Sequence, residues 1–240
     1  MRFFLFFFFL SSLTSLLAQQ KNEPQKPLIK ANWLKNPSAE EDEWELKRWE
    51  TNYPSVNSSN RVSRYGKTAS EWDFDCNEKC GLPNGAGNVY FRLESTSDEG
   101  ENMLDFFQTV DVSELAPFQE KGIEAVLNGW LAGSDSQAST CSELTVYLSL
   151  LDSQKKLINQ DTIIKNINDF HTLDEVEESR GHMHKFDPFK MNKQLPANTK
   201  FVRVLFFAEN KCAGIDASSS SAFYIDLLSL AFYPKKEEGK

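Results

Sequence analysis

The chain has 240 residues and a formal net charge of −9, with 35 acidic against 26 basic residues. So acidic a chain offers no broad basic surface for nucleic acid or anionic lipid, and it favours a neutral or basic partner, or a cation. Its length suits one large β domain or two small ones.

Residues 1–18 have the pattern of a secretory signal peptide: the basic residue Arg2, a nearly unbroken apolar run and the small residue Ala18 at the expected cut. The run is too short for an ordinary membrane span. A retained N-terminal anchor is the alternative. Cleavage predicts secretion and an extracellular location, leaves no later membrane span, and changes the net charge to −10. Residues 19–27 are polar and contain proline, which predicts a flexible arm.

Residues 28–234 are expected to form a single domain of β-strands, followed by a charged tail over residues 235–240. Two early segments, NVYFRLES and MLDFFQTV, alternate apolar and polar residues. GIEAVLNGWLAG and KFVRVLFFAE are apolar on both faces, which is typical of central strands. In ELTVYLSLL, the predicted core residues are Leu144, Val146, Leu148 and Leu150. Gly-, Ser-, Asn- and Asp-rich loops between these segments predict an all-β sandwich.

Four cysteines predict disulfides in a secreted chain. Three pairings are open, and we favour Cys76–Cys80 and Cys141–Cys212. A zinc site is the alternative, but Cys-x3-Cys without a matching pair nearby is a poor zinc pattern. Asn57 begins the sequon Asn-Ser-Ser, which predicts a glycosylated surface loop.

The closing segment YIDLLSLAF contains an acid among apolar residues. Strict alternation predicts one buried face made of Tyr224, Asp226, Leu228, Leu230 and Phe232. A buried carboxylate is costly without a partner. Asp226 is therefore expected either to pair with a basic residue, such as Lys35 or Arg203, or to bind calcium, which prefers oxygen ligands.

Several segments together resemble galactose-binding-like jelly rolls, a group that includes family 4/22-type carbohydrate-binding modules and F-box-associated sugar-recognition domains. LIKANWLKNPSAEEDEWELKRW resembles their opening, and DFFQTVDVSEL resembles a later strand and turn. The segment GIEAVLNGWLAG through LSLLDSQKKLI is similar to their central hairpin, and LPANTKFVRVLFFAE and SAFYIDLLSL are similar to their last two strands. The resemblance covers most of residues 28–234 and implies a jelly-roll β-sandwich.

The resemblance also implies a metal site and a ligand class. In carbohydrate-binding modules of this type, a structural calcium often joins an opening Glu to an Asp of the last strand, which implies Glu40 and Asp226 here. The F-box-associated readers place a Tyr-Trp-Lys cluster before the last strand, whereas this chain has AGIDASSSS there. Their chitobiose specificity is therefore not implied.

Exposed aromatic side chains stack on sugar rings. Trp44 and Trp72 lie in polar segments and are the candidate sugar-binding residues, with packing beneath a loop as the alternative. Trp49 and Trp130 are expected in the core.

Catalytic patterns are weak. Neither Gly-x-Ser-x-Gly nor His-Glu-x-x-His occurs, and the GHMH motif with His182 and His184 lacks a clear third metal ligand. A glycosidase pair of carboxylates cannot be told from a solvated acidic face. The sequence therefore predicts a secreted, non-catalytic module that binds an extracellular glycan or glycoprotein. The alternative is an extracellular protein-interaction or adhesion module on the same fold.

Overall fold

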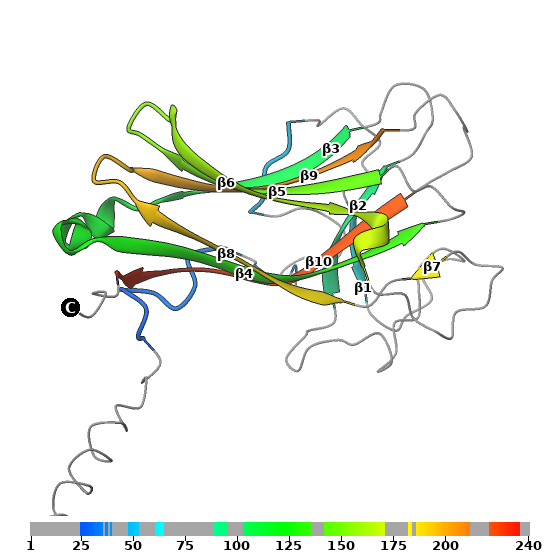
Figure 1. The fold of residues 1–240 in the computed structure, drawn as a ribbon, viewed down its shortest axis with the longest axis horizontal. Helices are drawn as coiled ribbons and strands as arrows, with labels where there is room; N and C mark the ends of the chain where they lie inside the picture. Colours follow the sequence, from blue (N-terminus) through cyan, green and yellow to red (C-terminus); the bar gives the residue numbers. More distant parts are fainter. Residues whose placement is uncertain are drawn as a thin grey trace, which may run out of the picture.

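A computed structural model describes two antiparallel β-sheets packed face to face (Figure 1). The described residues are 25–35, 37, 39, 48–52, 61–64, 89–95, 103–135, 142–170, 182–183, 186–211 and 221–235. Among them, no helix is long and apolar enough to cross a membrane.

The first sheet has six strands, in the order β1-β2-β10-β4-β7, with β8 also paired to β4. Their bounds are β1 Arg61–Arg64, β2 Val89–Ser95, β4 Ile123–Asp135, β7 His182–Met183, β8 Asp187–Leu195 and β10 Ser221–Pro234. The second sheet has four strands, in the order β3-β9-β5-β6. Their bounds are β3 Met103–Asp111, β5 Ser142–Leu151, β6 Leu157–Asn166 and β9 Phe201–Asn210. Two 3-10 helices, η2 and η3, span Ser113–Lys121 and Ile167–Asp169.

The strand order identifies the type of sandwich. Apart from the short strands β1 and β7, the strands pair in a nested order: the first pairs with the last, the second with the second-to-last, and so on. Thus β2 pairs with β10, β3 with β9, β4 with β8 and β5 with β6, all of them antiparallel. This nested pairing, wrapped into two sheets, is the jelly roll. The predicted all-β jelly-roll β-sandwich is therefore confirmed by the strand order.

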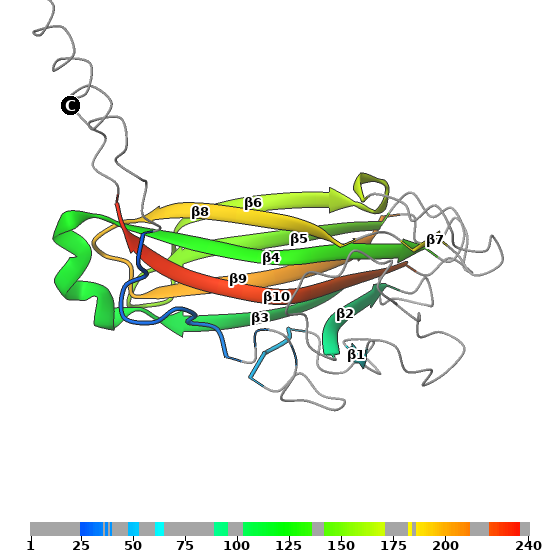
Figure 2. The ribbon, with the colours of Figure 1, turned by 90° about the horizontal axis from the view of Figure 1, so that it is seen from below.

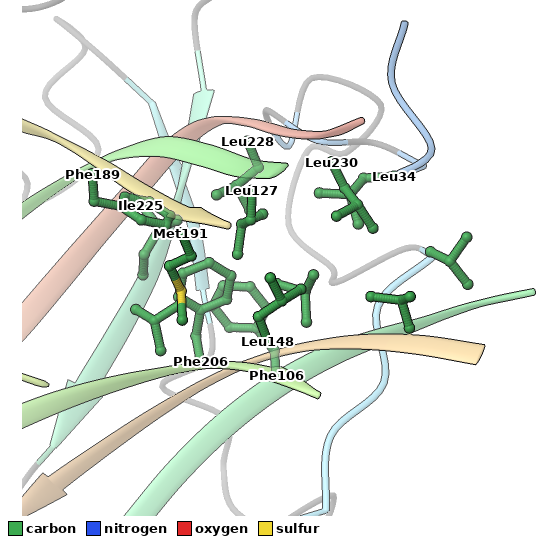
Figure 3. Close-up of a cluster of buried hydrophobic side chains, with 14 of the residues drawn as sticks. Leu34, Phe106, Leu127, Leu148, Phe189, Met191, Phe206, Ile225, Leu228 and Leu230 are labelled. Carbon is green, nitrogen blue, oxygen red and sulfur yellow. The ribbon is translucent and has the colours of Figure 1, made fainter. Parts of the chain in front are cut away.

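The core lies between the two sheets. The inward-facing side chains of β5, which alternate in the sequence, are fully buried as predicted. The ring of Phe206 stacks on Phe106 at 5.0 Å between centroids, and Trp49 meets Phe106 edge-on at 5.1 Å. Figure 3 shows Phe106, Phe206 and Leu148 of the four-stranded sheet facing residues of the six-stranded sheet, among them Leu127, Phe189, Met191, Ile225, Leu228 and Leu230. The expected core position of Trp49 is confirmed.

A β-bulge interrupts the alternation of β10. Asp226 lies opposite Trp130, but Ser229 lies opposite Asn128, so β10 has two residues where β4 has one. Within the bulge, Leu227 has a φ of 48°. An extra residue reverses the face that later side chains occupy.

The prediction of a single buried face on β10 is therefore wrong. Tyr224 and Asp226 lie on the outer face of the six-stranded sheet. After the bulge, Leu228, Leu230 and Phe232 point into the core. Asp226 is nevertheless buried, with none of its surface exposed.

Gly129 of β4 makes room for the bulge. A Cβ atom at this position would lie 2.6 Å from the Phe189 ring and 2.7 Å from the side chain of Leu228. Both contacts are far shorter than van der Waals distance. The glycine is therefore required because two core side chains pack directly on the backbone of β4.

The outer face of the six-stranded sheet carries a second aromatic group. Tyr90 meets Tyr224 edge-on at 5.3 Å and Phe186 at 6.4 Å, and all three are buried. Trp130 points to this same outer side, since its neighbour Leu131 belongs to the core, and it is only half-buried. The prediction that Trp130 lies in the core is therefore wrong.

The N-terminal strap, residues 25–35 and 37, completes the edge of β10. Strand β2 pairs with β10 only over residues 221–225. Figure 2 shows the strap, in blue, along the rest of that edge. Its backbone bonds are Leu28 N to Phe232 O at 2.7 Å, Trp33 N to Leu230 O at 2.8 Å and Leu228 N to Pro37 O at 3.1 Å. The beginning and the end of the domain are thus joined.

Asn32 supplies the side-chain part of this junction. Its Nδ2 donates to the carbonyl of Leu228 at 2.9 Å. Its Oδ1 accepts from the backbone N–H of Leu230 and of Leu34, both at 3.0 Å. The amide therefore replaces hydrogen bonds that a neighbouring strand would make.

We expect Asn32→Ala to lower the free energy of unfolding by about 2 kcal/mol, because backbone groups of β10 lose partners in a partly buried place. Asn192→Ala is the matched control. Asn192 donates to Glu124 at 2.8 Å on an exposed surface, so its loss should change stability by no more than about 0.5 kcal/mol. Urea denaturation of both variants measures the difference, and equal stability would contradict the role of the strap.

Candidate functional site

The outer face of the four-stranded sheet presents side chains in rows. No described helix or strand lies over this face (Figure 1). Residues paired across antiparallel strands point to the same side, so the register defines the neighbours. One row, the apolar row, consists of Phe107, Leu205 and Tyr147. The next, the polar row, consists of Thr109, Arg203, Ser149 and Gln160.

Strand β9 explains why apolar side chains reach this surface. Its inward residues are fully buried in the core: Val202, Val204, Phe206 and Ala208. Its outward residues, Phe201, Leu205 and Phe207, are also apolar but only half-buried. The two-sided apolar pattern correctly predicted a central strand, yet no described element covers its outer side. The result is a face with half-buried aromatic and aliphatic side chains on β9, next to Phe107 of β3, which is buried with 8% of its surface exposed.

The polar row is held by contacts within the sheet. Arg203 Nε donates to Thr109 Oγ1 at 3.1 Å, and its guanidinium lies 4.9 Å from the centroid of the Phe107 ring. Ser149 Oγ donates to Gln160 Oε1 at 3.1 Å. These contacts position hydrogen-bonding groups beside the apolar row before any ligand arrives.

Residues 48–52 border the face along β3. Glu50 exchanges two backbone hydrogen bonds with Phe107, both at 2.8 Å. Asp105 Oδ1 accepts from the hydroxyl of Thr51 and the backbone N–H of Asn52, each at 2.9 Å, and the Asn52 amide also donates to the carboxylate. Asp105 therefore anchors this border.

An ion pair lies at the end of the face where β5 begins and β9 ends. Lys211 Nζ lies 2.7 Å from Glu143 Oε2. This hydrogen bond raises the pKa of Lys211 above its usual value. The Lys211 side chain is 51% exposed and that of Glu143 16%, so solvent screens the pair and we expect it to add little to stability.

Most residues predicted to act at a site fall outside the described part of the chain. They are Glu40, Trp44, Asn57, Trp72, Cys76, Cys80, Cys141 and Cys212. Their predicted roles in calcium binding, sugar binding, glycosylation and disulfide formation stay predictions.

Asp226 is the one predicted site residue that the structure describes. Its Oδ1 accepts a hydrogen bond from Leu227 N at 2.6 Å. Two residues further on, Leu228 N binds the carbonyl of Pro37, three positions before Glu40. Among the described residues, no group of three or more acids, histidines or cysteines gathers around a common point.

The structure rules out one of the two basic residues considered as partners of Asp226. Arg203 is on the outer face of the other sheet, so that pairing is wrong. Lys35 has an exposed side chain, and its backbone N–H and carbonyl are both bound by the Gln108 amide, at 2.8 and 3.0 Å.

The rows on the four-stranded sheet were not predicted from the sequence. Tyr147, Arg203 and Phe207 were assigned to ordinary strand positions. The available signal was the apolar outward set of β9 next to the aromatic outward residue of β5. These outward residues could be recognised as a possible binding surface only once the structure showed that no described helix or strand covers this face.

Comparisons with known proteins identify relatives of the fold. No protein-family model matches the chain, and no curated protein does. Among solved structures, the enzymatically active domain of bacteriophage CBA120 tailspike protein 4 is 14% identical over 84% of this chain, with a TM-score of 0.46. The chain spans only 21% of that tailspike chain.

Carbohydrate-binding modules match over nearly their whole length. A CBM4 structure is 12% identical over 82% of this chain and 98% of its own, with a TM-score of 0.37. The CBM22-1 xylan-binding domain of Paenibacillus barcinonensis Xyn10C is 8% identical over 89% of this chain and 99% of its own, with a TM-score of 0.36. At such low identities and scores these are similarities of fold alone, and the jelly-roll assignment rests on the strand order.

Proposed function

We propose that the protein is a secreted, non-catalytic module that binds a glycan across the outer face of its four-stranded sheet. The observation that supports this proposal is the pairing of an apolar row with a polar row on an open face. Sugar rings present an apolar face to aromatic side chains and hydroxyl groups to hydrogen-bonding ones. The two rows offer both kinds of contact side by side.

The dimensions of the face suit a chain of several sugars. Neighbouring strands lie about 4.8 Å apart, so a row across four strands extends roughly 14 Å. Phe207 widens the apolar row on the side away from Arg203, and Thr162 of β6 extends it with an exposed hydroxyl. Binding to this sheet surface would cost little conformational entropy, because the strands already fix the side chains.

A structural calcium is part of the proposal. Its support is the resemblance that pairs Glu40 with Asp226, the complete burial of Asp226, and the hydrogen bond that brings Pro37 to the bulge. The ion would join the N-terminal strap to β10 and stabilise the domain, without taking part in chemistry.

A protein-interaction role is the second candidate, and a specific observation favours it. Ile164 and Leu157 of β6 are 54% and 58% exposed. Branched aliphatic groups at an exposed sheet edge suit a protein surface better than a sugar. Under this candidate, a protein partner would bind and no glycan would compete.

We expect Tyr147→Ala to weaken glycan binding by at least about tenfold, which corresponds to about 1.4 kcal/mol, because the apolar row loses its aromatic ring. A glycan array with the mature protein identifies the ligand, and calorimetry measures the affinity. Tyr233→Ala is the matched control, since Tyr233 is a half-buried tyrosine on the outer face of the other sheet. Trp72→Ala tests the sequence-based candidate in the same assay. Saturable binding that survives Tyr147→Ala would move the site away from this face, and no glycan binding at all would favour a protein partner.

A further inference from the structure

Arg203 is distinctive on the proposed binding face. Among the outward-facing residues of the described strands β3, β5, β6 and β9, it is the one basic side chain. Arg203 belongs to the polar row, directly beside the apolar row. A cation in this place is unexpected, because the chain as a whole carries a net charge of −9.

The contacts that hold Arg203 are neutral. Its Nε donates to the hydroxyl of Thr109, and its guanidinium stacks over the ring of Phe107 at 4.9 Å. Within the described part of the chain, Arg203 forms no ion pair, whereas Lys30 pairs with Glu114 at 3.5 Å and Lys211 with Glu143 at 2.7 Å. The positive charge on the face is therefore not neutralised by a described carboxylate.

None of the described acids of the same face forms an ion pair with Arg203. Asp111, in the next row, binds the Ser113 side chain and backbone N–H, which together lower the pKa of its carboxyl. Asp105 is bound by residues 51 and 52. Glu209 lies six residues along β9, roughly 20 Å away, which exceeds the Debye length of about 8 Å at physiological salt.

The held guanidinium has a defined chemical preference. Arg203 has its Nε bound to Thr109 and its Cζ atom 4.9 Å from the Phe107 ring centroid, so its two terminal nitrogens remain for a ligand. Their planar arrangement matches a carboxylate, which they can bind through two parallel hydrogen bonds. The alternative is that Arg203 only packs on Phe107. In that case the affinity for a ligand would not depend on whether the ligand carries a carboxylate.

We infer that the glycan bound by this face is largely neutral and carries an isolated carboxylate, as in a single hexuronic acid residue, which Arg203 binds. The inference rests on the proposed function. The overall acidity of the protein disfavours a polyanionic chain, while one guanidinium without an ion-pair partner among the described residues favours a single acidic group beside sugars that stack on the apolar row.

Matched ligands test the inference. Tetrasaccharides of β-1,4-linked glucose, galactose and mannose are each prepared in three forms: neutral, with one residue oxidised at C6 to the uronate, and with that uronate methyl-esterified. We expect at least one uronate form to bind about tenfold more tightly than its neutral and esterified forms, as a charge-assisted bidentate contact allows. Arg203→Gln should remove this preference, so that the uronate, neutral and esterified forms bind with similar affinity. Arg203→Lys should restore only part of it, because lysine lacks the planar fork.

Lys211→Gln is the control, since Lys211 is a basic residue near the same face that already pairs with Glu143. It should leave the preference unchanged. Thermal melts of all variants show that the domain is folded. Equal affinity for neutral and uronate forms, or a preference that persists in Arg203→Gln, would overturn the inference and leave glycan binding intact. Failure of every tetrasaccharide to bind would overturn the proposed function for these sugars, and the inference with it.

Discussion

Replacing Phe206 with alanine is expected to lower the free energy of unfolding by about 3–5 kcal/mol. Phe206 is fully buried at the centre of the sandwich, where it stacks on Phe106 and meets Trp49 and Phe189 edge-on, each at 6.3 Å. Removing the ring leaves a cavity that two rigid sheets cannot close. For a domain of this size the melting temperature should fall by at least roughly 6 °C.

The next residue provides the control. Phe207 has the same side chain on the same strand, but it points to the outer face and is only half-buried. Phe207→Ala should cost less than about 1.5 kcal/mol, since no closed cavity forms. It should instead weaken glycan binding, because Phe207 borders the apolar row. Equal losses of stability in the two variants, measured by urea denaturation, would contradict the assignment of these faces.

Calcium is expected to raise the melting temperature, and a chelator to lower it. Binding to the folded state alone adds about 2.7 kcal/mol when calcium is in hundredfold excess over its Kd. For a domain of about 200 residues this corresponds to roughly 5–10 °C. The physical reason is that an ion between Glu40 and the buried Asp226 would join the N-terminal strap to β10, and both must separate when the domain unfolds.

Three variants separate this site from general calcium binding by an acidic chain. Asp226→Asn and Glu40→Gln should each reduce the calcium response, while Glu43→Gln should leave it nearly intact. Magnesium should substitute poorly, because it requires a smaller octahedral shell of ligands. A melting temperature that does not move with calcium or chelator would mean that Asp226 is held by protein groups alone.

Strand identity and core composition were largely predictable. The alternation in ELTVYLSLL correctly predicted that Leu144, Val146, Leu148 and Leu150 are buried, and the same pattern predicted Phe106 and Phe91 on the core faces of β3 and β2. Alternation is a local property of the extended backbone, so the sequence of each strand is enough to predict which of its residues point inward. The resemblance of ordered segments to jelly rolls added the topology, which the nested pairing confirms.

Alternation within a single segment predicted the wrong faces for β10, because β10 carries a bulge opposite β4. The bulge at Leu227 exists because β10 carries one residue more than β4 between two paired positions. Nothing within YIDLLSLAF marks this insertion, and so Asp226 was placed on the face of Leu228 although the two point to opposite sides. Trp130 was misplaced for a related reason: it is apolar and central in its strand, yet the register directs it outward.

The class of fold and the inner face of most strands could be predicted from short segments, because periodicity and resemblance are contained in them, whereas Asp226 was predicted to be buried on the wrong face. The proposed binding face, in contrast, depends on long-range strand pairing. Phe107, Tyr147 and Leu205 belong to three strands that are distant in the chain, and they become neighbours only when β9 pairs between β3 and β5. Arg203 likewise gains its significance from Thr109 and Phe107, almost a hundred residues away. Such neighbours are set by long-range strand pairing, whose register follows from the packing of the whole core and not from any single segment.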